Sequence, residues 1–170
     1  QHVGRWWLIS AIARVMRPGA KVDHVLILEG EQGLRKSQAI ATLAREDDWF
    51  TDHIGDLQSK DTLQQIHGPW IIELAELDQF SRSEISRIKA FFTARIDRFR
   101  PPYGRSPQNF ARQCVFAGTV NPGNIGYLRD DTGNRRFWPV KVTASKLDEI
   151  ARDRDQLWAE AAEAYHAGAR

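Results

Sequence analysis

The 170-residue sequence has little of several features that mark particular classes of protein. Its one cysteine, Cys114, lies in an apolar run and has no second cysteine with which to form an internal disulfide. The cysteine and the five histidines show no metal-ligand spacing, so we expect no zinc site. No apolar run is long enough to cross a bilayer, and no segment has the pattern of a signal peptide. We therefore expect a cytoplasmic protein that does not bind membranes.

The charge balance excludes a simple electrostatic prediction. Lys and Arg number 24 and Asp and Glu 22, which leaves a net charge of +2 with His neutral. Nucleic-acid binding must therefore depend on where the arginines cluster. No repeat, low-complexity segment or break in composition divides the chain, so we expect one domain over residues 1–170. The sequence opens in the middle of a helical pattern, which suggests a fragment of a longer protein.

The most informative stretch runs from Val25 to Ser37 and reads VLILEGEQGLRKS. An apolar run ends at Gly30, a second glycine follows at Gly33, and Lys36 then opens a helical pattern. This is the layout of a phosphate-binding loop, in which glycines let backbone N–H groups close around phosphates. Lys36 would reach the β- and γ-phosphates of ATP, and Ser37 would ligate Mg²⁺. The alternative is an ordinary glycine turn between a strand and a helix.

One position departs from the usual pattern of this loop. The pattern G-x-x-x-x-G-K-[ST] has a glycine where this chain has Arg35. An arginine there either crowds the phosphate or adds a cation to it, and the sequence leaves both alternatives open. The residues expected to bind the nucleotide are Gly30, Gln32, Gly33, Leu34, Arg35, Lys36 and Ser37.

Apolar strands alternate with amphipathic helices along the rest of the chain. We expect helices over residues 5–16, 36–44, 59–66, from 81 onward and 155–166, and strands over residues 24–29, 70–74, 114–119 and 136–142. This alternation predicts an α/β fold of three layers with a central, mainly parallel sheet covered on both faces. Together with the phosphate-binding loop, it is the layout of a P-loop NTPase-like domain. Ligands of such sheets bind at the carboxyl ends of the strands.

Three finer expectations concern packing. In the first helix, apolar residues at three- and four-residue steps predict that Trp6, Ile9, Ala13 and Met16 face inward. Trp49 and Phe50 are expected in a linker, with their rings beneath the sheet. Pro139 lies within the last strand and indicates an edge position, because proline cannot donate a hydrogen bond to a neighbouring strand.

Carboxylates gather where the strand over residues 70–74 ends: Glu73, Glu76 and Asp78. An apolar strand that ends in an acid is typical of NTPases, which use such acids to hold Mg²⁺ and polarise the attacking water. Glu73 lies inside the apolar run, so it needs a partner such as Mg²⁺, Ser37 or an arginine. Glu76, nearer the open end, is the better candidate for orienting water. Alternatively, Glu73 forms a salt bridge in the scaffold and Glu76 is simply solvated.

Two further polar groups lie next to strands. Asn121 follows the third strand, where its amide can contact a γ-phosphate or the attacking water, although Asn121-Pro122-Gly123 is equally good turn chemistry. Arg135 and Arg136 lead into the last strand. In ring ATPases an arginine at such a place acts as a finger on the γ-phosphate of the neighbouring subunit. The alternative is a pair of surface arginines.

Five blocks occur in a characteristic order: EGEQG with KS over residues 29–37, WIIELAEL over 70–77, RFRPPYGR over 98–105, FAGTVNP over 116–122 and GNRRFWPV over 133–140. With these blocks the chain resembles, over nearly its whole length, the virulence-associated protein E (VapE) family of phage, plasmid and pathogenicity-island proteins. That family is similar to the superfamily three helicases of the AAA+ ATPases and often lies beside, or is fused to, a primase domain. The resemblance implies an ATP-dependent, helicase-like replication motor that forms a homo-oligomeric ring such as a hexamer.

The resemblance also implies roles for single residues. The phosphate loop corresponds to Gly30, Gly33, Lys36 and Ser37, with Ser37 and Glu73 on Mg²⁺. The implied catalytic residues are Lys36, Glu73 and Glu76 as Walker B acids, Asn121 as the sensor, and Arg135 or Arg136 as the finger. Neither the catalytic acid nor the finger arginine is singled out by the resemblance.

The segment over residues 97–112 is expected to form a loop or hairpin. In superfamily three helicases a hairpin just before the sensor strand carries basic residues to DNA in the ring's channel, and the resemblance places Arg98, Arg100, Tyr103 and Arg105 there. Arginines neutralise phosphates and an aromatic ring stacks on a base, so single-stranded DNA is the expected partner. The alternative is a rigid loop whose arginines pair with nearby acids.

Two functions are therefore open. The first is an ATPase motor that moves this hairpin along single-stranded DNA. The second, favoured by Arg35, keeps the fold and binds nucleotide or DNA but hydrolyses poorly, and serves in replication-complex assembly or in interference with another replicon. A small-molecule kinase would share the loop but would need a phosphoacceptor pocket and a lid, which the sequence does not indicate.

Overall fold

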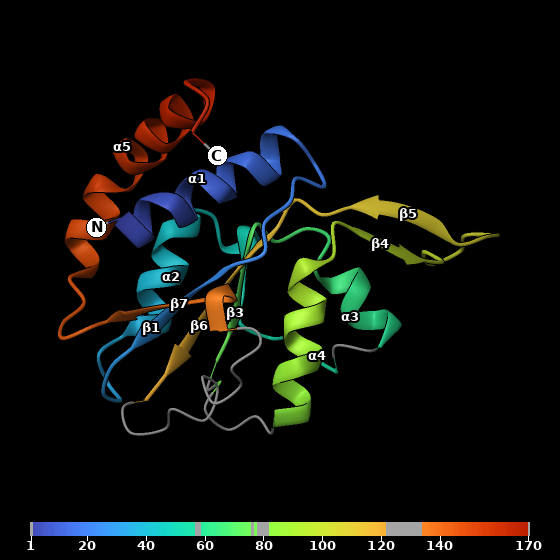
Figure 1. The fold of residues 1–170 in the computed structure, drawn as a ribbon, viewed down its shortest axis with the longest axis horizontal. Helices are drawn as coiled ribbons and strands as arrows, with labels where there is room; N and C mark the ends of the chain where they lie inside the picture. Colours follow the sequence, from blue (N-terminus) through green and yellow to red (C-terminus); the bar gives the residue numbers. More distant parts are fainter. Residues whose placement is uncertain (1, 57–58, 76, 78–81, 122–133, 170) are drawn as a thin grey trace.

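A five-stranded parallel sheet forms the centre of the computed structural model, which describes residues 2–56, 59–75, 77, 82–121 and 134–169 (Figure 1). The strands are β1 (Val25–Glu29), β2 (Phe50–Thr51), β3 (Ile71–Leu74), β6 (Val115–Val120) and β7 (Phe137–Lys141). Their order is β2-β3-β6-β1-β7, and every neighbouring pair is parallel. The predicted α/β fold with a mainly parallel sheet is confirmed.

Helices cover both faces of this sheet (Figure 1). They are α1 (His2–Met16), α2 (Lys36–Ala44), α3 (Lys60–Gln65), α4 (Arg82–Thr93) and α5 (Leu147–His166). Figure 1 shows α1, α2 and α5 on one side, with α3 and α4 on the other. Within the described residues no helix is both long and apolar enough to span a membrane.

Two apolar clusters, one on each face, hold the layers together. Leu26 of β1 packs in the cluster that contains Trp7 of α1 and Ile40 of α2, whereas Ile27 packs with Phe92 of α4. Successive residues of a strand point to opposite faces, so a strand covered on both faces needs apolar residues throughout. This explains why β1 reads as a continuous apolar run.

Outside the sheet, β4 (Ile96–Phe99) and β5 (Gln108–Ala111) pair in an antiparallel hairpin that projects from the body of the molecule (Figure 1). The alternative of an irregular loop over residues 97–112 is therefore excluded. Two short 3₁₀ helices, η1 (Asp47–Trp49) and η4 (Asn134–Arg136), precede β2 and β7.

Some expected elements need correction. Phe50 belongs to the short edge strand β2, which pairs with β3, rather than to a linker. Trp49 is 44% exposed and meets the ring of Trp70 edge-on, so it does not lie beneath the sheet. The helices at the two ends begin at His2 and Leu147, earlier than expected. The edge position that Pro139 indicated is confirmed, because β7 ends the sheet.

The buried face of α1 differs from the expected one. Ile9 is buried as expected, but Met16 is 54% exposed, and the large residues that α1 buries are Trp7 and Arg14. Trp7 Nε1 donates a hydrogen bond of 2.9 Å to the carbonyl of Phe116, a strand residue of β6. The helix thus buries polar as well as apolar groups, so an apolar stripe alone could not identify its inner face.

The single cysteine lies in the core. Cys114 directly precedes β6 and is 1% exposed, and burial raises the pKa of its thiol to about 11. A thiol that is buried and protonated at neutral pH is chemically inert, so Cys114 contributes as a small apolar residue.

Gly118 in the middle of β6 has no room for a side chain, because a Cβ atom there would overlap Leu77 Cδ1 and lie 3.0 Å from Ile27 Cδ1. We predict that Gly118→Ala lowers the free energy of unfolding by about 1–3 kcal/mol through overpacking. Gly4 of α1 faces open space, so Gly4→Ala should raise the same quantity by up to about 1 kcal/mol. Urea unfolding of both variants measures the two opposite effects, and a Gly118→Ala protein as stable as the wild type would contradict the packing.

Candidate functional site

The carboxyl ends of the parallel strands β1, β3 and β6 lie together at one end of the sheet, and β6 lies between the other two strands. The loop that leaves β1 begins at Gly30, whose N–H donates to the carbonyl of Val120 at 3.2 Å. A Cβ atom on Gly30 would lie 2.5 Å from the carbonyl oxygen of Val142, so only glycine fits. The loop is thereby fixed beside β6, and α2 starts at Lys36 as predicted.

Lys36 is 8% exposed, and its ammonium group lies inside this loop. Its Nζ donates to the carbonyls of Gly30 at 2.6 Å and Glu31 at 2.9 Å, and to Oδ1 of Asn121 at 3.4 Å. An ammonium group has three donors, and all three are used here. The structure therefore brings together two residues that the sequence placed at separate strand ends.

Glu73 of β3 is fully buried and receives two hydroxyl groups on one oxygen. Ser37 Oγ donates to Oε1 at 2.7 Å and Thr119 Oγ1 donates to the same atom at 2.9 Å, whereas Oε2 is buried without a partner. Burial raises the pKa of this carboxyl group, and the two hydroxyl hydrogen bonds only partly oppose that rise. Ser37 was one of the partners that the sequence allowed for this carboxylate.

Thr119 is the residue of this site that the sequence analysis missed. Ala117 pairs with Glu73 across the two strands, and Thr119 follows two residues later, on the same face of the sheet. The available signal was a hydroxyl residue near the end of the strand beside the acidic strand, whereas the sequence analysis predicts Asn121 as the polar group there.

A cavity of about 370 Å³ opens beside these groups. Of the predicted residues, those that line it are Gln32, Gly33, Arg35, Lys36, Ser37 and Asn121. Gly30, the first residue of the loop, is buried, and the side chain of Leu34 lies against Gly30. Glu76 lies outside the described residues.

Arg35 adopts the left-handed backbone conformation, with φ 56° and ψ 36°. This region costs a non-glycine residue about 1–2 kcal/mol, which explains why the usual pattern has glycine here. The exposed side chain lines the cavity. Arg35 therefore has a strained backbone conformation and adds a positive charge to the lining of the cavity.

Arg135 and Arg136 lie at the amino ends of the strands, opposite the carboxyl ends at which Lys36 lies. They precede β7, whose first residue, Phe137, pairs with the first residue of β1. The loop follows the other end of β1, about 13 Å away at the usual rise of a strand. Within one chain these arginines therefore do not join Lys36.

The hairpin presents its basic residues to solvent. Arg98, Arg100 and Arg105 are exposed, and Tyr103 is fully exposed with a φ of 60°. In the described part of the chain, no acid forms an ion pair with these three arginines. The alternative in which they pair with nearby acids is thus not found among the described residues.

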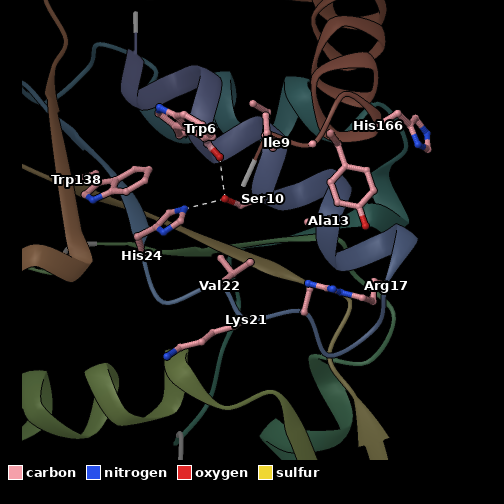
Figure 2. Close-up of a pocket in the computed structure, with 14 residues that line it drawn as sticks. Trp6, Ile9, Ser10, Ala13, Arg17, Lys21, Val22, His24, Trp138 and His166 are labelled. Carbon is pink, nitrogen blue, oxygen red and sulfur yellow. Dashed lines mark hydrogen bonds between the residues drawn. The ribbon is translucent and has the colours of Figure 1, made fainter.

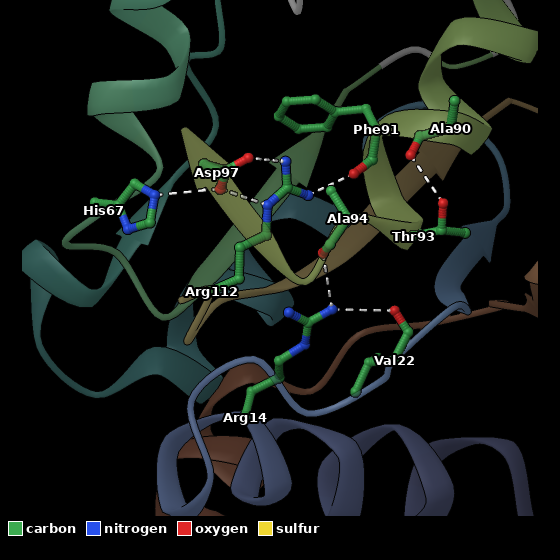
Figure 3. A network of polar contacts seen from close by, with 9 residues as sticks. All are labelled: Arg14, Val22, His67, Ala90, Phe91, Thr93, Ala94, Asp97 and Arg112. Atoms are coloured by element: carbon green, nitrogen blue, oxygen red, sulfur yellow. Dashed lines mark hydrogen bonds and ion pairs between the residues drawn. The ribbon is translucent and has the colours of Figure 1, made fainter. Parts of the chain in front are cut away.

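A buried ion pair fixes the base of the hairpin (Figure 3). Arg112 donates from Nε and Nη2 to the two oxygens of Asp97 at 2.6 and 2.7 Å, and His67 Nε2 lies 3.2 Å from the same carboxylate. Burial acts to raise the pKa of Asp97, but the hydrogen bonds from His67 and Arg112 outweigh it and hold the pKa below its ordinary value. Arg112 also donates to the carbonyl of Phe91 in α4, which joins the hairpin to that helix.

Comparison with known proteins gives a family and a fold. The sequence matches the family described as the virulence-associated protein E-like domain over residues 1–170. Two solved structures of the apo NrS-1 C terminal region are similar, with TM-scores of 0.65 and 0.62 at 17% and 15% identity. The match covers 95% of this chain but 41% of each of those chains, so at these identities it shows the fold alone. No curated protein matches.

The raised pKa of Glu73 predicts a pH dependence of stability. The unfolded chain releases this proton near the ordinary value of 4.5 and the folded chain at a higher pH, so stability is lost as pH rises from about 4.5 through the folded value. Glu73→Gln cannot ionise and lacks this loss. We predict that the unfolding free energy of Glu73→Gln, relative to wild type, increases between about pH 4 and pH 8.

Urea unfolding across this pH range measures the difference. Glu160→Gln, an exposed substitution in α5, is the matched control for the loss of one carboxyl group. A Glu73→Gln difference that varies with pH no more than that of the control would contradict the prediction.

Proposed function

The chain belongs to the virulence-associated protein E-like domain family, and on this basis we propose that it is the ATP-hydrolysing motor module of a DNA replication protein. The observation that carries the proposal is the meeting of Lys36, Asn121 and the Ser37–Glu73 pair at one sheet edge, beside a cavity. A lysine for the phosphates, and a hydroxyl group and a carboxylate for Mg²⁺, are groups that P-loop NTPases use to hold a nucleoside triphosphate.

In this proposal Lys36 is the main phosphate ligand. Its three donors are held by two loop carbonyls and by Asn121, so an incoming phosphate would replace at least one of them. The weakest bond, 3.4 Å to Asn121, is the easiest to exchange. The lysine would then move onto the phosphate, and the amide of Asn121 would be released to contact the γ-phosphate or the attacking water.

The buried, unpartnered Oε2 of Glu73 supports a cation site next to Ser37. Ser37 and Glu73 would hold Mg²⁺, which neutralises charge on the phosphates. Mg²⁺ usually takes one or two protein ligands together with phosphates and water, and Ser37 and Glu73 would be those ligands.

The arginine finger would come from a second subunit. Arg135 and Arg136 lie at the amino ends of the strands and the loop lies at their carboxyl ends, so neither arginine could complete the site of its own chain. In a ring, the arginines of one subunit would lie against the loop of the next subunit and supply the missing cation. Hydrolysis would then require assembly.

Single-stranded DNA is the proposed track, and the hairpin is its contact. Three exposed arginines and the exposed Tyr103 can neutralise phosphates and stack on a base. The Asp97–Arg112 pair connects this hairpin to α4, which follows β3 and Glu73 in the chain. A movement at the nucleotide would thus reach the DNA contact through α4.

We predict that Lys36→Ala lowers ATP hydrolysis by about 100-fold or more, the usual effect of removing one preorganised donor. The measurement is phosphate release across protein concentration, with and without single-stranded DNA. The wild-type rate should rise more steeply than linearly with concentration, because assembly completes each site. Arg98→Ala combined with Arg100→Ala should abolish stimulation by DNA.

A mixing experiment separates a finger in trans from one in cis. Lys36→Ala subunits keep their arginines, and Arg135→Ala/Arg136→Ala subunits keep their loop, so mixtures of the two inactive proteins should recover part of the activity. Lys146→Ala, which changes an exposed side chain, is the control, and mixing it with either inactive variant should not change the activity beyond that of its own subunits. Unchanged hydrolysis by Lys36→Ala would refute the ATPase assignment.

Arg35 supports the second candidate, a module that binds nucleotide but hydrolyses it poorly. Its strained backbone predicts that Arg35→Gly raises the free energy of unfolding by about 0.5–1 kcal/mol, after the greater freedom of glycine in the unfolded chain is subtracted. If hydrolysis also rises at least about tenfold, equivalent to 1.4 kcal/mol of barrier, the natural protein is attenuated. An unchanged rate would show that the motor tolerates the arginine.

A further inference from the structure

A second cavity, of about 840 Å³, lies between α1, the segment that leads into β1, the start of β7 and the end of α5 (Figure 2). His24 directly precedes β1, and Trp138 pairs with Leu26 near the start of that strand. The cavity is therefore at the amino ends of the strands, and the phosphate loop is at their carboxyl ends. The motor mechanism proposed above does not use it.

Aromatic side chains line much of this cavity. Trp138 and His24 are stacked, with ring centroids 3.7 Å apart and planes 8° from parallel. Trp6 and Tyr165 add two further rings to the lining. Volumes of a few hundred to about 1,000 Å³ with aromatic walls are typical of sites for small organic ligands.

The imidazole in this wall is neutral and fixed. Burial lowers the pKa of His24 to about 4, with the charge of Asp23 opposing the shift. Ser10 donates its hydroxyl proton to the carbonyl of Trp6 at 2.7 Å, so its contact of 2.7 Å with His24 must be an N–H donated by Nε2. The aromatic wall is thus uncharged at neutral pH and held in one orientation.

The charged groups of the cavity are cationic. Arg17 and Lys21 are exposed and are among the residues that line it, and Figure 2 shows their side chains extending in different directions. No Asp or Glu lines it among the described residues. Lys21 pairs with Asp23 at 3.3 Å, but its side chain is 71% exposed, so this pair is weak and can open. An uncharged aromatic wall with a cationic rim is complementary to a flat ring that carries a negative group.

We propose that this cavity binds one nucleotide unit, with the base against the aromatic wall of Trp6, His24 and Trp138 and the phosphate beside Arg17 and Lys21. Stacking on aromatic rings accepts any base, and a phosphate forms charge-assisted hydrogen bonds with a cationic side chain of the rim. The unit can come from a free mononucleotide or from single-stranded nucleic acid, since the chemistry is the same. The site is separate from the proposed ATP site and does not depend on it.

Tryptophan indole N–H signals in nitrogen-15 NMR spectra test this directly. The indoles of Trp7, Trp70 and Trp158 donate to backbone carbonyls elsewhere and serve as internal references. Titration with thymidine monophosphate, and separately with a short oligothymidylate, should shift the signals of Trp6 and Trp138. The spectrum also shows whether each variant is folded.

Arg17→Glu and Lys21→Glu should each weaken the affinity about tenfold, because each turns an attractive charge into a repulsive one. Lys146→Glu is the matched control, because its side chain is 70% exposed and also forms an exposed ion pair, and it should change the affinity less than about twofold. Trp138→Ala should weaken binding roughly 5- to 100-fold through lost stacking.

The two probes distinguish the sources. Binding of the monophosphate alone would assign a free nucleotide, and binding of the oligomer alone a strand, and either supports the site. Equal affinity for thymidine without its phosphate would overturn the proposal. So would equal binding by the Lys21→Glu and Lys146→Glu proteins, or shifts that leave Trp6 and Trp138 unchanged.

Discussion

The candidate site depends on the burial of one carboxylate. Glu73 lies inside the sheet with no exposed surface, and the hydroxyl groups of Ser37 and Thr119 both donate to its Oε1. These two bonds join the start of α2 and the end of β6 to β3, so the positions of three separate elements are coupled through one oxygen atom. The energetic cost of burying a carboxyl group favours this arrangement, because any other position of α2 would remove the Ser37 bond and leave only the one from Thr119.

The fold could be predicted where the sequence repeats a simple pattern. Continuous apolar runs identified β1, β3 and β6, and Gly30 with Lys36 marked the turn and the start of α2. The edge strand β2 has two residues, too few for any periodicity, and it is defined only by its pairing with β3. Local patterns therefore predicted the centre of the sheet better than its edge.

The site was predicted in part, and its limits have a physical cause. Lys36, Ser37 and Asn121 carry recognisable chemistry next to strand ends, so the sequence could place them at one edge. The contact of Thr119 with Glu73 depends on the register between β3 and β6, which is set by packing between segments far apart in the chain. Arg14 is a second example, because it is buried in α1 and its guanidinium donates to the carbonyl of Val22, a contact that no local pattern indicates.

The inert thiol of Cys114 has a practical consequence for the hairpin. Because the native cysteine is buried and stays protonated, a cysteine introduced at the tip position Tyr103 would react alone with a maleimide dye. A fluorophore at that tip could report the distance between hairpins of neighbouring subunits by energy transfer, without any background label in the core. The protein is thus already suited to single-molecule observation.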